Sequence, residues 1–127
     1  MQESPLVVEH CNDLTIVRFA FENLADGNRA RATAEALLSF GTIVRPEKTI
    51  VDFSNVNMIS PKVINALLEL RKQMTSFGGQ VKIAGLSTGV REVFQILHLD
   101  GSVFEIHNST TGAERAFRKN EPGVRKA

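Results

Sequence analysis

The sequence predicts a single α/β domain with a mixed, mostly parallel sheet, an N-terminal β-hairpin and about four helices, in the order ββαβαβαβα. The chain has 127 residues, fewer than the roughly 150 that serve as a prior for one domain. Its composition, 43% hydrophobic and 23% charged, is typical of a folded globular protein. After two initial β-rich runs, strand-like and helix-like segments alternate, and this alternation favours right-handed crossovers onto a mostly parallel sheet.

The hairpin is predicted over residues 6–11 and 14–19, two β-rich runs separated by Asn12 and Asp13. Both of these residues tolerate the positive φ of a two-residue turn. We expect a loop over residues 21–27 and then a helix. The helix is indicated by one stripe of mostly small residues at helical spacing: Ala30, Ala34, Leu37 and Gly41.

A third strand is predicted over residues 48–53, and the clearest helix of the chain begins after it. Ser60 is the expected N-cap, and Pro61 is the expected first helical residue, where its missing N–H costs nothing. Gly78 and Gly79 supply the left-handed stop. Between these limits runs a continuous apolar stripe: Val63, Leu67, Leu70, Met74 and Phe77.

The remaining elements are a strand over residues 80–86, a short helix that begins at Ser87 and Thr88, a strand over residues 103–106 and a helix over residues 109–117. Thr111 and Glu114 have the spacing of a capping box in the last helix. The short helix is expected to direct four side chains to one face: Val90, Val93, Phe94 and Leu97. We expect the domain to span residues 1–118, followed by a basic C-terminal tail over residues 119–127.

The chain offers little for catalysis or for a cofactor. Its histidines, His10, His98 and His107, lack metal-ligand spacing to cysteine or carboxylates, and Cys11 has no histidine assigned to activate it. No glycine pattern matches a phosphate-binding loop. We therefore expect no enzyme activity, no cofactor and no metal.

The net charge and the composition of the terminal segments narrow the class of protein further. The net charge is +1, and the chain lacks Trp and Tyr, so nucleic-acid binding is not expected despite five basic residues from Arg115 onward. No apolar run is long enough to cross a bilayer, and the N-terminus lacks the features of a secretory signal. One cysteine fits a reducing compartment. The expected location is cytoplasmic.

Residues 50–68, IVDFSNVNMISPKVINALL, resemble the core of STAS domains, the family of bacterial anti-sigma-factor antagonists and of cytoplasmic domains of sulfate transporters. The shared pattern is an apolar strand that ends in Asp, a short loop and a Leu-rich helix. Residues 70–79 with the strand at 81–86, and the helix segment at 87–99, are similar to the elements that follow in the family. The likeness extends from about Thr49 to Phe117.

The resemblance implies a binding function that phosphorylation controls. In the family, a hydroxyl residue at the start of this helix is phosphorylated by a serine kinase of the ATPase fold, which is also an anti-sigma factor. The unphosphorylated domain binds that partner. Phosphate at a helix N-terminus adds up to about −2 charge to the surface. The chain departs from this pattern, because Pro61 and Lys62 occupy the two hydroxyl positions, while Ser60 replaces an Asp and Val63 a Gly.

The sequence therefore predicts a STAS-like interaction module that binds an anti-sigma factor, or other STAS proteins, without phosphorylation at the usual position. Ser60 is expected to be a helix cap, with a displaced phosphoacceptor as the alternative. Two further interpretations stay open: a sensor of a small ligand or anion, and a scaffold subunit. Lys62 is either a solvated residue or a contact to an acidic partner. The expected partner-binding residues are Asn57, Met58, Ser60, Pro61 and Lys62. Leu24 and Asp26 are expected alongside them, in a loop that departs from the family's Gly-x-Leu-Asp pattern but keeps these two residues as relics of it.

Overall fold

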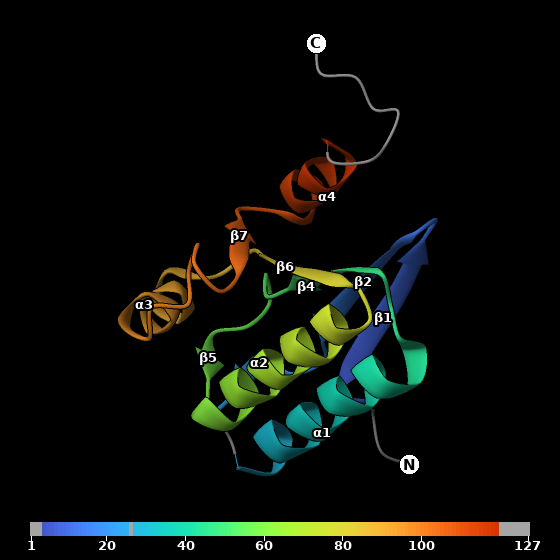
Figure 1. The fold of residues 1–127 in the computed structure, drawn as a ribbon. Helices are drawn as coiled ribbons and strands as arrows, with labels where there is room; N and C mark the ends of the chain where they lie inside the picture. Colours follow the sequence, from blue (N-terminus) through green and yellow to red (C-terminus); the bar gives the residue numbers. More distant parts are fainter. Residues whose placement is uncertain (1–3, 26, 120–127) are drawn as a thin grey trace.

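The computed structural model describes residues 4–25 and 27–119, which form a five-stranded sheet with helices on both faces (Figure 1). The strand order is β1-β2-β4-β6-β7, with β1 antiparallel to β2 and the other neighbours parallel. The strands are β1 (Leu6–Cys11), β2 (Leu14–Phe19), β4 (Lys48–Asp52), β6 (Gln80–Ala84) and β7 (Glu105–His107). The helices are α1 (Gly27–Val44), α2 (Pro61–Ser76), α3 (Thr88–Ile96) and α4 (Thr110–Lys119). The predicted fold class is confirmed.

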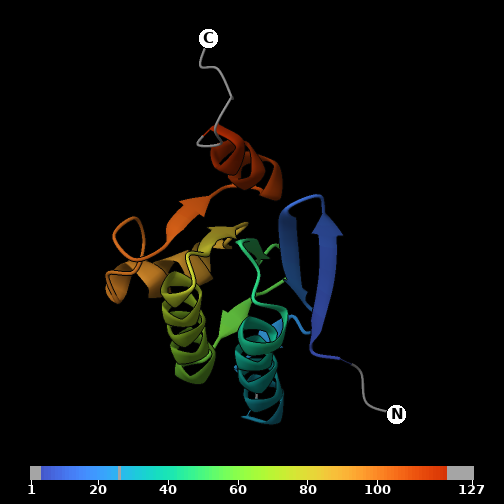
Figure 2. The ribbon, with the colours of Figure 1, turned by 45° about the vertical axis from the view of Figure 1, so that its right-hand side comes forward.

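The helices form two unequal layers around the sheet. α1 and α2 lie side by side on one face, and α4 lies on the other (Figures 1 and 2). Consecutive strand residues face opposite layers, so Val51 joins the large core under α1 and α2, while Ile50 joins the small core under α4. Because both faces of the central strands are covered, most of their residues are buried, and these include four polar ones: Thr15, Thr49, Asp52 and Lys82.

The predicted signals at the helix and hairpin ends match the structure. Asn12 adopts a positive φ of 59° in the two-residue turn between β1 and β2. Ser60 and Ser87 are the N-caps of α2 and α3, and Gly78 follows α2 with a φ of 84°. The small-residue stripe of α1 is buried against α2 and the sheet.

Several local predictions are wrong. The two segments predicted as loops contain a second, two-stranded sheet, β3 (Asn23–Leu24) with β5 (Met58–Ile59). The cap of α4 is Ser109, whose Oγ accepts a hydrogen bond from the Gly112 N–H at 3.1 Å, rather than Thr111, which lies inside the helix. Leu97 is 49% exposed because α3 ends at Ile96, one residue before it. The last strand begins at Glu105, two residues later than expected.

Candidate functional site

Two short parallel strands position the turn that leads into α2. Asn23 of β3 pairs with Met58 of β5, and Leu24 pairs with Ile59. Just before this pair, the Asn57 N–H donates to the carbonyl oxygen of Glu22 at 2.8 Å. These backbone bonds bring the segment before α1 against the segment before α2, so two of the loops expected at the site form one surface.

The loop between β4 and β5 is tied to the ends of three strands. The Phe53 N–H donates to the Ala84 carbonyl at 2.8 Å, and the Asn55 amide donates to the Phe19 carbonyl at 2.6 Å. Asp52, buried at the end of β4, accepts from the Ser54 N–H at 3.0 Å and from Arg18 Nε at 3.1 Å. The loop therefore presents β5 from a fixed base.

Ser60 ends the loop and begins α2. Its backbone is extended, with φ −102° and ψ 158°, and its Oγ accepts a hydrogen bond from the Val63 N–H at 3.4 Å. Its carbonyl oxygen also accepts from Val63 and Ile64. This is N-cap geometry, in which the hydroxyl satisfies a helix donor that would otherwise lack a partner. The side chain is half-buried.

The residues around Ser60 present a mixed surface to solvent. Met58 is 53% exposed, and Asn57, Pro61 and Lys62 are exposed as well. The first turn of α2 carries Lys62 and no acidic residue. The Lys62 charge therefore adds to the positive end of the helix dipole, and no carboxylate of this turn balances it. Such a surface favours an acidic partner group beside an apolar one.

The two residues expected from the other loop have different outcomes. Leu24 is completely buried in the main core, so its side chain is not part of the surface but anchors β3 beneath it. Asp26 lies outside the described residues. The exposed neighbour that sequence reasoning missed is Asn23, which lies beside Met58. Its Oδ1 accepts from the Ala25 N–H at 2.8 Å and so shapes the chain after β3.

A small cavity of about 220 Å³ adjoins the turn and extends the candidate site toward α3. Met58 and Ile59 line one side, and Gly89, Val90 and Val93 from the first turns of α3 line the other. Helix α3 was not among the elements expected at the site. The spacing of Val90 and Val93 is the signal for it in the sequence, but this spacing equally predicts a buried core face.

The histidines and the cysteine lie away from this turn. His10 Nδ1 and Thr15 Oγ1 are 3.3 Å apart on the hairpin, and His107 Nε2 lies 2.6 Å from Glu105 Oε2 on β7. Cys11 is a half-buried free thiol. Across the described residues, no group of three or more His, Cys, Asp or Glu side chains could hold a metal ion.

The C-terminal basic residues are divided by the end of α4. Arg115, Arg118 and Lys119 belong to that helix, and Arg118 forms a salt bridge of 3.3 Å with Glu114. Residues 120–127 lie outside the described part of the chain. Among the described helices, none is long and apolar enough to cross a membrane.

Together, the sheet order, the helices on both faces and the capped turn before α2 define an α/β module with an exposed strand–helix turn as its candidate binding surface. The family model of the STAS domain matches residues 7–113. The chain therefore belongs to the STAS domain family. Comparison with curated proteins finds no significant match.

Solved structures of other proteins share this fold. An anti-sigma-factor antagonist (STAS) domain protein from Planctomyces limnophilus is 22% identical, with a TM-score of 0.77, over 87% of this chain and 96% of that one. The phosphorylated form of the Bacillus cell fate determinant SpoIIAA is 14% identical, with a TM-score of 0.64, over 87% and 98%. The murine anion transporter Slc26a9 is 16% identical, with a TM-score of 0.70, over 88% of this chain but only 19% of that one. These similarities establish the fold.

Proposed function

We propose that this chain is a protein-interaction module of the anti-sigma-factor antagonist type, which binds an anti-sigma factor or serine kinase of the ATPase fold through the turn before α2. The proposed contact surface, here called the β5–α2 surface, is formed by Asn57, Met58, Pro61 and Lys62, with Asn23 beside them and Ser60 at its centre as the cap of α2. The carrying observation is that β3 and β5 hold this turn exposed at the start of a capped helix. A module of this kind needs no reacting groups, and we propose no enzyme activity for it.

The chemistry of the turn supports binding that phosphorylation does not control. Ser60 Oγ is the acceptor of the cap bond from Val63, and the next two positions carry no hydroxyl. The cap bond already satisfies the Val63 N–H without phosphate, so α2 needs no modification to be capped. Lys62 adds a fixed positive charge where phosphorylated relatives gain a negative one. We propose that the domain is permanently in the binding state.

The similarity to the Planctomyces structure and to SpoIIAA, both of which are described as anti-sigma-factor antagonists, supports an antagonist role. The transporter match covers only a fifth of its chain.

The proposal is tested by affinity capture with matched baits from an extract of the native host. Wild-type protein, Lys62→Glu and Lys72→Glu are immobilised, and the captured proteins are quantified by mass spectrometry. Lys72 is an exposed lysine of the same helix, about 15 Å further along its axis. It therefore controls for charge reversal on α2.

The expected result is an anti-sigma factor of the ATPase fold on the wild-type and Lys72→Glu baits and its loss from Lys62→Glu. Equal recovery on all three baits would place binding elsewhere on the domain. Recovery of a transporter, with no anti-sigma factor, would contradict the proposed function itself.

A further inference from the structure

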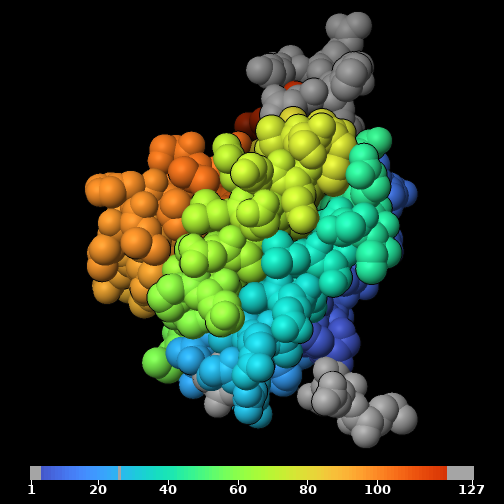
Figure 3. All heavy atoms as spheres, turned by 60° about the horizontal axis from the view of Figure 1, so that its bottom comes forward, coloured from blue at the N-terminus to red at the C-terminus, as the bar shows by residue number. Residues whose placement is uncertain are grey.

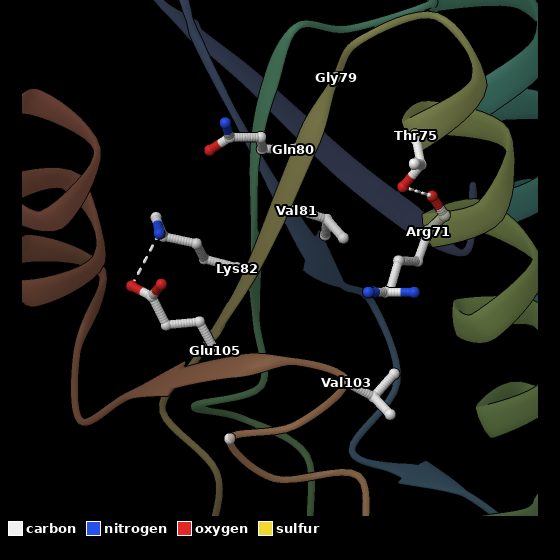
Figure 4. Close-up of a pocket in the computed structure, with 9 residues that line it drawn as sticks. Arg71, Thr75, Gly79, Gln80, Val81, Lys82, Val103 and Glu105 are labelled. Carbon is white, nitrogen blue, oxygen red and sulfur yellow. Dashed lines mark hydrogen bonds and ion pairs between the residues drawn. The ribbon is translucent and has the colours of Figure 1, made fainter. Parts of the chain in front are cut away.

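A second exposed feature lies on the outer face of α1 and α2, where the two helices form adjoining bands across the surface (Figure 3). A groove of about 430 Å³ runs between them. Its floor contains Ala34 and Ala66, which are only 7% and 4% exposed, and its rim carries charged side chains. This groove is larger than the cavity beside α3 and also than the polar pocket between α2 and the β6–β7 edge (Figure 4).

Residues of α1 and α2 that are 31 positions apart in the sequence lie at the same height along the two helix axes. Gln73 Nε2 lies 3.5 Å from Thr42 Oγ1, a contact between residues 31 positions apart in the sequence. The helices run in the same direction, because each connects two parallel strands of the sheet (Figure 1). The same offset of 31 residues aligns the groove residues in levels, Arg31 with Lys62, Glu35 with Ala66 and Leu38 with Glu69.

Charge is separated along these levels. The first level carries two cations, Arg31 and Lys62, and the carboxylates of Glu35 and Glu69 lie one and two helical turns further on. At about 1.5 Å per residue, Glu69 lies about 10 Å beyond Lys62 along the axis. Within residues 4–25 and 27–119, none of these four side chains forms a salt bridge. The groove thus has a positive end and a negative end that the fold itself does not neutralise.

We propose that this groove is a self-association surface and that its occupant is the same face of a second copy of this chain. A two-fold axis across the helices, at the level of Ala34 and Ala66, turns the second copy antiparallel. Lys62 of each copy then lies opposite Glu69 of the other. The two Glu35 carboxylates lie near the axis, each about one helical turn from Arg31 of the other copy, so every charge of the groove has an opposite charge within reach.

The small residues allow the two copies to approach closely, and the charges favour the antiparallel pairing over a parallel one. Alanine at the centre lets four helices approach closely, as small residues do at helix contacts. Arg31 lies opposite Leu38 of the second copy and can cover it with its aliphatic stem. A face-to-face pairing with parallel helices would instead bring Arg31 against Lys62, and like charges in contact are repulsive.

This surface differs from the proposed partner-binding turn but shares Lys62 with it. A dimer and an anti-sigma partner would therefore compete for that side chain. The self-association test needs only the purified chain, so its result does not depend on whether an anti-sigma partner exists.

The test uses two complementary double variants and sedimentation velocity over a wide range of protein concentrations. Arg31→Glu/Lys62→Glu makes both ends of the groove negative, and Glu35→Lys/Glu69→Lys makes both ends positive. All four positions are exposed on helix surfaces, and circular dichroism verifies that each variant is folded. Arg115→Glu and Glu47→Lys, exposed charges away from the groove, serve as matched controls.

We expect concentration-dependent dimers of the wild-type chain and of both controls, dimers that weaken as salt is added. Each double variant alone should stay monomeric, and an equimolar mixture of the two should recover the dimer. A wild-type chain that is monomeric at every concentration would overturn the proposal. So would double variants that dimerise as the wild type does, because association would then use another surface, such as the free edge of β1.

Discussion

The Ser60 hydroxyl accepts a hydrogen bond from the Val63 N–H at 3.4 Å and thereby caps α2 at the centre of the proposed β5–α2 surface. Ser87 makes the equivalent bond to Val90 at the start of α3, at 3.3 Å. Ser109 caps α4 through Gly112 in a similar way, so the described residues include three serine caps, and of these only Ser60 lies in the β5–α2 surface, directly before Pro61 and Lys62. Substitutions at Ser60 and Ser87 can therefore be compared to distinguish a capping role from a signalling role.

Ser60→Ala should lower the free energy of unfolding by about 1 kcal/mol, because a helix donor loses its acceptor. Ser87→Ala is the matched control and should cost a similar amount. Urea unfolding measures both, and partner affinity should be unchanged in both. If Ser60→Ala lost partner binding while keeping its stability, Ser60 would be a contact or a modified residue rather than a cap.

Gly41→Ala should destabilise the chain by up to about 2 kcal/mol, because overpacking between α1 and α2 outweighs the gain of about 1 kcal/mol in helix propensity. A Cβ at this position would lie 2.5 Å from Gln73 Oε1 and 2.6 Å from Leu70 Cδ1. Gly89→Ala in α3 is the control, since its Cβ would meet nothing within 4 Å and alanine favours a helix. Thermal and urea unfolding should shift in opposite directions for the two variants. A neutral Gly41→Ala would show that Gln73 and Leu70 can move aside.

Thr49→Val should raise the free energy of unfolding by about 1 kcal/mol, because an unpaired buried hydroxyl is costly and valine has nearly the same shape. Thr49 is fully buried in β4, and its hydroxyl has no hydrogen-bond partner among the described residues. Thr15→Val is the contrasting variant, because the Thr15 hydroxyl contacts His10 Nδ1 at 3.3 Å. Urea unfolding compares the two. A lower stability for Thr49→Val would indicate that the hydroxyl is satisfied, for instance by a water molecule.

The chain should lose stability in acid partly through Glu105. The Lys82 ammonium, 2.7 Å away, and more weakly His107 hold the pKa of Glu105 below its ordinary value of 4.5, against the opposing effect of burial. A carboxyl group with a lowered pKa in the folded state stabilises the fold above its ordinary pKa. This contribution is lost as the pH falls through the lower, folded-state value.

The measurement is urea unfolding at a series of pH values from about pH 6 downward through the ordinary pKa of 4.5 into acid. Lys82→Met should flatten the loss of stability in acid, because the pKa of Glu105 then returns toward its ordinary value. Lys72→Met, which removes an exposed lysine, should keep the wild-type profile. Identical acid profiles for wild type and Lys82→Met would show that the pair contributes nothing to folding.

The five strands of the main sheet and the four helices were predictable from the sequence, apart from the exact bounds of β7, because most have either a clear period or a clear end signal. The Ser60–Pro61 start and the Gly78 stop of α2 are local chemistry that tertiary contacts do not change. β3 and β5 escaped prediction because two residues are too few to show an alternation of buried and exposed side chains. Their pairing depends on contacts between distant segments.

The candidate site was predictable only in part for the same reason. Residues 57–62 are contiguous in the sequence and include the start of α2. Once the helix start is predicted, their place at the turn is predicted as well. The burial of Leu24 and the approach of α3 depend on the pairing of β3 with β5, which no local signal reveals. The charge separation between α1 and α2 likewise depends on the register of two helices that the sequence alone does not align.

Binding of a partner by the β5–α2 surface without phosphorylation control can be tested by a single titration. The affinity of the purified chain for its recovered anti-sigma partner is measured by calorimetry before and after incubation of the two with ATP and Mg²⁺, with intact mass followed in parallel. We predict unchanged mass and unchanged affinity. A mass gain of one phosphate on Ser60, with loss of binding, would contradict the proposed function of this turn.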